Sequence, residues 1–349
     1  MKSIFVTGGC GYIASHTCLL LLNQGYTVYS IDSCVNSTSK SLQNVLCISN
    51  LLKSQYKEKL YFYNGDIRNK KTLRNIFQNA KKNNQNISSV IHFAGLKSVT
   101  ESLSEPIEYW QNNINGTINL LDIMSEFECK TIVFSSSASI YGSSNNIVNE
   151  KSHINPINPY GMTKYVIEKF LNDIYKCSPN DWKVANLRYF NPIGAHSSGQ
   201  IGENSTGLIS NIFPLILRVA SGKIPFLEVF GNNWDTYDGT CVRDYIHVMD
   251  LAEGHIKTLE HLENHRHQLL TLNLGTGIGT SVLELINTFE NENNVRVPYK
   301  FAAKRVGDIS YLVADNYLAK KILKWSPQRS IRDMCKDGWN WTKSNPDGY

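Results

Sequence analysis

The chain has 349 residues, of which 42% are hydrophobic and 19% are charged, and its formal net charge is +5. This is the composition of an ordinary globular α/β protein, and its basic stretches "KEK" and "AKK" lack the interleaved aromatic residues of a nucleic-acid-binding surface. We expect no membrane span, because apolar runs stay below roughly 18 residues, and no metal site, because the cysteines lack ligand spacing.

Short apolar runs alternate with longer amphipathic stretches through the first half of the chain. The first run, "SIFVTG", begins at Ser3, so we expect no signal or transit peptide and predict a cytoplasmic protein with free thiols. Further buried strands are predicted at 26–32, 60–67, 89–95, 131–137 and 183–191, and helices near 12–23, 69–82, 106–127 and 160–176. This alternation predicts an α/β fold with a doubly wound Rossmann-type parallel sheet, whose ligands lie at the carboxyl ends of the strands.

After about residue 191 the alternation loosens. A loop-like stretch, "NPIGAHSSGQIGEN", precedes a predicted helix at 207–222, and isolated strands are predicted at 227–231, 271–277 and 299–305. We therefore predict two domains, a nucleotide-binding domain at 1–190 and a smaller C-terminal α/β substrate-binding domain at 191–349. Some later segments are expected to return to the first domain.

The first strand runs into a glycine-rich loop, "TGGCGYIA", at residues 7–14. Gly8 and Gly11 fall where a dinucleotide-binding loop turns sharply and brings backbone N–H groups to a pyrophosphate at a helix N-terminus. Ala14 stands where the third glycine of that pattern would be, and a methyl group can satisfy the close helix–strand packing required there. Alone, the loop could also be a plain strand-to-helix turn.

Two carboxylates at later strand ends support nucleotide binding. Asp32 ends the second strand, where it can accept hydrogen bonds from ribose hydroxyls, and the absence of a nearby arginine favours NAD over NADP. Asp66 ends the third strand, where it could meet the adenine amine. A helix N-cap is an equally good interpretation of Asp66.

Polar side chains with acid–base chemistry follow in the middle of the chain. "YGMTK" places Tyr160 and Lys164 four residues apart, hence on one face of a predicted helix, and Ser137 ends a strand that would lie beside it. An ammonium and a cationic nicotinamide would both lower the pKa of the phenol toward working pH. The alternative is an ordinary Tyr–Lys pair on an amphipathic helix.

At this point the sequence resembles the UDP-glucose 4-epimerases of the extended short-chain dehydrogenase/reductase family. The resemblance covers essentially the whole chain, in the stretches "TGGCGYIASHT", "IHFAGLKSVTES", "NNINGT", "FSSSASIYG", "NPYGMTK", "LRYFNPIGAH" and "DGTCVRDYIHVMDLAEGH". It implies a tightly held NAD that is reduced and reoxidised in each turnover while UDP-galactose and UDP-glucose are interconverted. Tyr160 would take the proton of the sugar 4-hydroxyl, Ser137 would bridge the two oxygens, and Lys164 would hold the nicotinamide ribose.

The same resemblance implies the remaining ligand contacts. The NAD site would be lined, beside Gly8 and Gly11, by Tyr12, Ile13, Asp32, Asn36, Asp66, Ile67, Phe93, Ala94, Gly95, Lys97, Asn112 and Phe190. The UDP-sugar would be held, beside Ser137 and Tyr160, by Asn191, Asn211, Arg243, Arg305 and Asp308. Two arginines suit a diphosphate, because each planar guanidinium can bind phosphate oxygens bidentately. Taken singly, each arginine could equally form an ordinary surface ion pair.

The chain departs from the family pattern at Cys10, Ala14 and Leu312. Leu312 falls where bacterial relatives carry a tyrosine that closes the sugar pocket. We therefore predict room for an N-acetyl group, as in UDP-GalNAc or UDP-GlcNAc, unless Tyr311 fills the same space.

Two rival functions are weighed against epimerisation. A nucleotide-sugar dehydratase needs a carboxylate after the strand-end serine, where this chain has Ala138, Ser139 and Ile140. A non-catalytic relative would be expected to lack Tyr160 or Lys164. The apolar faces of the helices near 106–127 and 160–176 favour a homodimer, although they could simply pack on the sheet.

Overall fold

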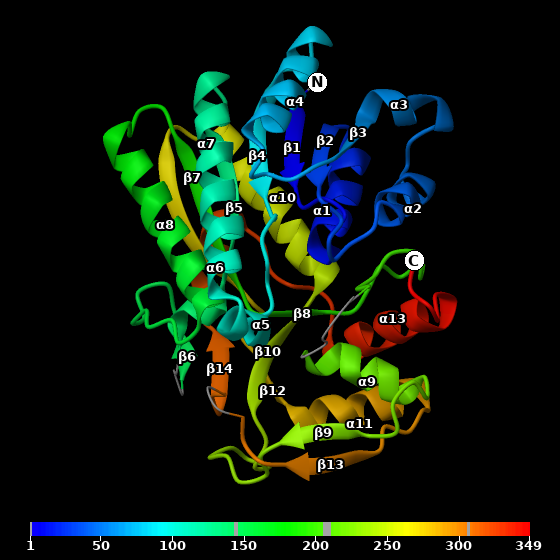
Figure 1. The fold of residues 1–349 in the computed structure, drawn as a ribbon. Helices are drawn as coiled ribbons and strands as arrows, with labels where there is room; N and C mark the ends of the chain where they lie inside the picture. The colour runs from blue at the N-terminus through cyan, green and yellow to red at the C-terminus, as the bar shows by residue number, and fades with distance from the viewer. Residues whose placement is uncertain (1, 143–145, 205–210, 306–307) are drawn as a thin grey trace.

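The computed structural model describes residues 2–142, 146–204, 211–305 and 308–349 (Figure 1). Within these residues the largest sheet has seven strands, and every neighbouring pair is parallel. Across the sheet the strands are β11 (Gln268–Leu274), β7 (Lys183–Tyr189), β5 (Thr131–Ser137), β4 (Ile87–His92), β1 (Ser3–Thr7), β2 (Thr27–Asp32) and β3 (Leu60–Asn64). The predicted doubly wound sheet is therefore present, with β11 from the second half of the chain at its edge.

Helices cover both faces of this sheet (Figure 1). One face carries α1 (Tyr12–Asn23), α2 (Lys40–Ile48), α10 (Val248–Asn264) and α12 (Tyr317–Leu323), whose apolar residues share one core cluster with the strands. The other face carries α4 (Lys70–Lys82), α7 (Gly116–Glu126) and α8 (Pro159–Cys177), which share a second cluster. Shorter elements complete this part: η1 (Lys53–Gln55), α3 (Tyr56–Lys59), α5 (Val99–Ser104), α6 (Pro106–Tyr109), η2 (Trp110–Asn115) and η3 (Ala138–Tyr141).

The remaining elements lie beyond the carboxyl ends of the parallel strands, at the bottom of Figure 1. A small sheet contains β12 (Gly279–Ser281), β10 (Val242–His247), β14 (Tyr311–Ala314) and β6 (Ile147–Val148), and β8 (Asn191–Ile193) also pairs with β10. A two-stranded sheet pairs β9 (Leu227–Phe230) with β13 (Tyr299–Ala302). The helices α9 (Ile212–Ala220), α11 (Val282–Asn293) and α13 (Ile331–Ser344) pack around a third core cluster.

Two helices differ from their predicted form. The predicted helix at 106–127 consists of α6 and α7 with the π-helical turn η2 between them. The predicted helix at 207–222 corresponds to α9, and residues 207–210 lie outside the described ones. Among the described helices none is both long and apolar enough to cross a bilayer.

Candidate functional site

In the glycine-rich loop after β1, the absence of side chains on the glycines lets other groups approach the backbone closely. Gly8 has a φ of +69°, and a Cβ atom there would lie 2.8 Å from the backbone nitrogen of Ala94. Gly11 is the N-cap of α1, and no side chain among the described residues caps this helix. The N–H groups of the first turn are thus available to an anion. Ala14 is 2% exposed and belongs to the core cluster under α1, where its methyl group packs.

Asp32 organises the backbone around this loop. Its Oδ2 accepts the N–H of Cys10 at 2.9 Å, and its Oδ1 accepts the N–H of Cys34 at 2.8 Å and the hydroxyl of Ser37 at 2.9 Å. An ionised carboxylate has about four acceptor positions, so one remains for a ribose hydroxyl. Asn36 lies exposed on the same turn.

Asp66 and Ile67 follow β3. Asp66 is not a helix cap, because Asn69 caps α4 by accepting the N–H of Thr72 at 3.1 Å. The Asp66 carboxylate instead binds the Arg68 guanidinium at 2.7 and 3.0 Å. Burial raises the pKa of Asp66, but the bonds from Arg68 outweigh it and lower that pKa overall. Asp66 therefore remains a candidate for the adenine contact.

The segment after β4 brings the nucleotide loop close to α8. Phe93 and Ala94 meet Gly8, and a Cβ atom on Gly95 would lie 3.8 Å from the Nζ atom of Lys164. Asn113, which is 1% exposed, accepts the N–H of Leu96 at 2.8 Å. Asn113 also donates to Leu96 O at 3.2 Å and to Thr163 Oγ1 at 3.0 Å.

Asn113 is a functional candidate that the sequence reasoning missed. The predicted residue was its neighbour Asn112, which is only partly buried. Both asparagines lie in η2, where the π-helical turn changes the residues that share a face. The pattern "NNING" alone therefore gave no way to choose between them.

The predicted catalytic residues meet at the carboxyl end of β5. Asn158 caps α8 by accepting the N–H of Gly161 at 2.8 Å, and Pro159 occupies the first helical position. Tyr160 and Lys164 thus begin the helix on one face, and Lys164 Nζ donates to the carbonyl of Ser135 at 2.7 Å. Ser137 is 8% exposed, and its Oγ accepts the N–H of Ser139 at 3.1 Å.

Burial controls the acid–base properties of this group. It lowers the pKa of Lys164 to about 7. It raises the pKa of Tyr160, while a hydrogen bond with Ser137 acts in the opposite direction. A cation bound near the phenol would act in the same direction as Ser137 and lower the pKa of Tyr160.

Candidate substrate residues gather on the small sheet. Arg243 on β10 lies in register with Leu312 on β14, and Asn191 on β8 lies in register with Tyr245 on β10. The sheet thus joins three of the predicted substrate contacts, each from a different strand.

Two more predicted residues reach this region from the segment after β13. The Arg305 guanidinium lies 3.6 Å from the centre of the Phe230 ring, and the Asp308 N–H donates to Arg305 O at 3.2 Å. Burial raises the pKa of the Cys241 thiol, Arg243 lowers it and Asp308 raises it, so both charges lie near Cys241. Asn211 is the exposed N-cap of α9.

Leu312 and Tyr311 point to opposite faces of β14. Leu312 is 8% exposed and shares a buried apolar cluster with Ala138 and Phe190, beside Ser137. The Tyr311 hydroxyl lies instead beside Gly279, where a Cβ atom would be 3.2 Å from it. Successive side chains of a strand alternate in this way, so Tyr311 does not occupy the space next to Leu312.

The segment 194–204 closes against the nucleotide loop, and we call it the strap. The Tyr12 hydroxyl donates to Gly194 O at 2.6 Å, and Lys97 forms an ion pair with Glu203 at 3.1 Å. Ile201 is fully buried in the same core cluster as Ala14. The strap therefore contacts the nucleotide loop, α1 and the segment after β4.

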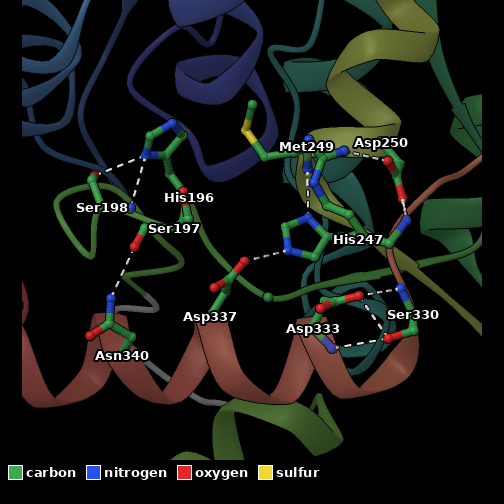
Figure 2. Close-up of polar contacts among 12 residues, drawn as sticks. His196, Ser197, Ser198, His247, Met249, Asp250, Ser330, Asp333, Asp337 and Asn340 are labelled. Atoms are coloured by element: carbon green, nitrogen blue, oxygen red, sulfur yellow. Dashed lines mark hydrogen bonds and ion pairs between the residues drawn. The ribbon is translucent and has the colours of Figure 1, made fainter.

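The C-terminal region holds the strap in place. Figure 2 shows His196, Ser197 and Ser198 beside α13, with Asn340 donating to Ser197 O at 3.1 Å. His247, at the end of β10, bonds to Asp337 of the same helix at 3.2 Å. The Tyr349 hydroxyl donates to Gly202 O at 3.2 Å and accepts the Gly202 N–H at 3.1 Å.

These features fit a dinucleotide. The glycine loop offers uncapped N–H groups and a close backbone approach, Asp32 retains an acceptor position, and Gly95 leaves space beside the Lys164 ammonium. The described residues contain no His, Cys, Asp and Glu group arranged to hold a metal ion.

Known proteins match this chain over essentially its full length. The family described as GDP-mannose 4,6 dehydratase matches residues 5–338. UDP-glucose 4-epimerase 2 of Arabidopsis thaliana is 45% identical, over 100% of this chain and 97% of the relative. A Stenotrophomonas maltophila UDP-glucose 4-epimerase, solved with NAD and formylated UDP-arabinopyranose, superposes with a TM-score of 0.93 at 41% identity and 99% coverage of both chains. A Bifidobacterium longum enzyme, solved with NAD+ and UDP, gives 0.91 at 40% identity, with 100% of both chains covered.

Proposed function

Because the chain belongs to the GDP-mannose 4,6-dehydratase family and matches UDP-glucose 4-epimerases over its whole length, we propose that it interconverts UDP-galactose and UDP-glucose with NAD as cofactor. One observation carries the proposal for the site. Ser137 of β5 and Tyr160 and Lys164 of α8 meet beside Gly95, which lies on the segment that contacts the nucleotide loop. An acid–base group and a nucleotide cradle thus adjoin each other.

Each residue has a separate task in the proposed reaction. NAD, when bound, supplies the two-electron acceptor and donor for sugar carbon 4. Tyr160 takes the proton of the sugar 4-hydroxyl and returns it after the 4-keto sugar has rotated to present its other face. Ser137, whose oxygen is fixed by the Ser139 N–H at 3.1 Å, bridges the phenol and the sugar oxygen. Lys164 places its ammonium next to the phenol and the nicotinamide ribose.

The substrate must be held firmly at one end and loosely at the other. Arg243, Arg305 and Asp308 come from two segments near Cys241 and would grip the diphosphate and uridine. The 4-keto sugar, which contacts mainly apolar side chains such as Leu312, can then rotate to present its other face. The resident NAD would be held by the remaining predicted contacts, Gly8, Gly11, Tyr12, Ile13, Asp32, Asn36, Asp66, Ile67, Phe93, Ala94, Gly95, Lys97, Asn112 and Phe190.

The decisive experiment uses the purified protein with UDP-galactose and no added NAD. We expect UDP-glucose to form without accumulation of NADH, because the cofactor is regenerated in each turnover. No product, with or without added NAD, would refute the function. A 4-keto-6-deoxy product would indicate a dehydratase instead, but the residues after Ser137 supply no carboxylate for elimination.

Acceptance of N-acetylated UDP-hexosamines is a second part of the proposal. It is supported by the side-chain directions on β14, because Leu312 shares an apolar cluster with Ala138, the residue after Ser137, while Tyr311 points to Gly279. A leucine leaves more space than a tyrosine at the wall of the sugar pocket.

A homodimer and a cytoplasmic location complete the proposal. Five apolar residues between 99 and 118 are exposed on consecutive helical segments, and we call this set the 99–118 patch: Val99, Leu103, Ile107, Trp110 and Ile118. Single exposed apolar residues are common, whereas several that lie together would be typical of a protein interface. All eight cysteines are free thiols, which suits a reducing compartment. The proposed division into domains at 1–190 and 191–349 is supported by a core cluster that lies wholly within the second region. The segments of β11, α10 and α12 share a cluster with the first region, as expected for segments that return to it.

A further inference from the structure

A second glycine-rich loop, "GTGIG" at residues 275–279, lies between β11 and β12. Its N–H groups bind a carboxylate of the chain itself. Asp244 Oδ1 accepts the N–H of Thr276 at 2.8 Å and its hydroxyl at 2.7 Å. Asp244 Oδ2 accepts the N–H of Gly277 at 2.9 Å and the N–H of Ala314 at 3.2 Å.

Asp244 is fully buried, and it forms no ion pair with a cation among the described residues. Burying a carboxylate is costly unless hydrogen bonds replace its water, and the four donors do so here. The Asp244 carboxylate packs tightly against the loop, because a Cβ atom on Gly275 would lie 2.6 Å from Asp244 Oδ2. The Asp244 side chain therefore fixes the positions of β10, the 275–279 loop and β14 relative to one another.

Those segments carry candidate substrate residues. Asp244 belongs to β10, directly after Arg243, and its Ala314 partner belongs to β14, two residues after Leu312. Arg243 and Leu312 are in register on these two strands. Since side chains alternate along a strand, the buried Asp244 and the partly exposed Arg243 project from opposite faces of β10.

We propose that Asp244 is a positioning residue for the UDP-sugar. By holding the 275–279 loop and β14 against β10, it fixes the Arg243 guanidinium relative to Leu312. A guanidinium binds two phosphate oxygens only when its plane is correctly oriented, so loosening this junction weakens substrate binding. The inference rests on the proposed function in one respect, the role of Arg243 at the diphosphate.

The test is Asp244→Asn, which keeps the side-chain volume but replaces one acceptor oxygen with a donor that faces N–H groups. We expect the KM for UDP-galactose to rise about tenfold while kcat stays within about twofold, since Arg243 binds ground and transition states alike. Calorimetry should show UDP itself binding about tenfold more weakly. Bound NAD should be unchanged, because the four hydrogen bonds of the Asp244 carboxylate go to residues 276, 277 and 314 and none goes to the glycine loop at 7–14.

Asp250→Asn is the matched control. Asp250 is also fully buried, but it lies on α10 and binds Arg329, whose backbone N–H donates to it at 2.9 Å (Figure 2). We expect this variant to lose stability without a change in KM or in UDP affinity. Thr276→Val supplies a milder variant, because it removes the hydroxyl, which donates to Asp244 and accepts the Ile278 N–H at 3.1 Å, but keeps the Thr276 N–H donor. We expect a KM about threefold higher.

The results distinguish a positioning role of Asp244 from a purely structural one. If Asp244→Asn and Thr276→Val keep wild-type KM and UDP affinity, Asp244 is only a structural residue and the proposal is overturned. A fall in kcat at unchanged KM would overturn it equally. Absence of UDP-galactose turnover in the wild-type protein would refute the proposed function, whereas UDP calorimetry on both proteins tests Asp244 without any turnover.

Discussion

The Lys164 ammonium lies 5.9 Å from the centre of the Tyr160 ring, one helical turn away on α8, and 5.0 Å from the Phe134 ring of β5. Its hydrogen bond to Ser135 O ties the helix to the strand that ends in Ser137. This bond, together with the bond between Ser136 of β5 and Glu168 of α8, holds the predicted base beside the strand that carries the bridging hydroxyl. The roles of Tyr160 and Lys164 can each be tested by substitution.

Replacing Tyr160 with Phe removes the proposed proton acceptor and keeps the ring. We expect kcat to fall by about 10²- to 10⁴-fold, with the melting temperature and the bound NAD unchanged. Tyr165→Phe, one turn along the same helix, is the control and should keep full activity. Wild-type turnover in Tyr160→Phe would show that another group is the base.

Lys164 makes the stability of the protein depend on pH. Burial lowers its pKa to about 7, whereas an unfolded lysine has a pKa of about 10.4. Between these values the unfolded chain binds one more proton, so this residue makes the free energy of unfolding rise with pH by about 1.4 kcal/mol per unit.

Lys164→Met abolishes that contribution, so its unfolding free energy should rise less steeply between about pH 7.5 and 9.5. Urea unfolding without nucleotide, at several pH values, measures the difference. Lys169→Met, an exposed position on the same helix, should follow the wild-type curve. Parallel curves for the wild type and Lys164→Met would contradict the assignment.

Substitutions at Gly8 and Ala14 test which of the two positions requires a glycine. Gly8→Ala places a Cβ atom 2.8 Å from Ala94 N at a positive φ, so we expect the purified protein to lose its NAD. Ala14→Gly is the matched change in α1. It should cost about 1 kcal/mol in stability and leave NAD content and activity intact. Equal NAD content in both variants would refute the role of Gly8.

Leu312→Tyr tests the size of the sugar pocket. We expect turnover of UDP-GalNAc to drop at least about tenfold relative to UDP-galactose, because the larger ring fills space beside Ser137. Tyr311→Phe, whose ring points to Gly279, should leave the ratio unchanged. If the wild type barely accepts UDP-GalNAc and Leu312→Tyr changes nothing, the pocket is closed by something else.

The 99–118 patch can be tested by charge. Ile107 is 72% exposed, and Ile107→Glu should convert the proposed dimer to a monomer in sedimentation at micromolar concentration. Leu52→Glu, at a 68% exposed position outside the patch, is the control and should not change the mass. A wild-type protein that sediments as a monomer would exclude the homodimer.

The sheet and the catalytic helix could be predicted because their signals are local. Buried parallel strands are short apolar runs, and the spacing of Tyr160 and Lys164 fixes a shared helix face. The position of Asp32 at a strand end is also a local property, and the structure places its carboxylate on the glycine loop.

Other features depend on contacts that no local pattern encodes. The burial of Asn113 beside the predicted contact Asn112 follows from a π-helical turn, and Asp244 looks like an ordinary polar residue until the 275–279 loop is folded onto it. The lowering of the Tyr160 pKa by an ammonium and a cationic nicotinamide can be predicted from residue types, whereas the opposing effect of burial depends on the packed environment.

The bond between Tyr349 and Gly202 also bears on the order in which the protein is made. The glycine loop leaves the ribosome early, and at roughly 5–20 residues per second the segment that secures the strap follows some twenty seconds to a minute later. During that interval the nascent chain lacks the bonds by which Tyr349 holds the strap. We expect NAD to bind chains without those bonds, which chains stalled before residue 341 would reveal by binding labelled NAD.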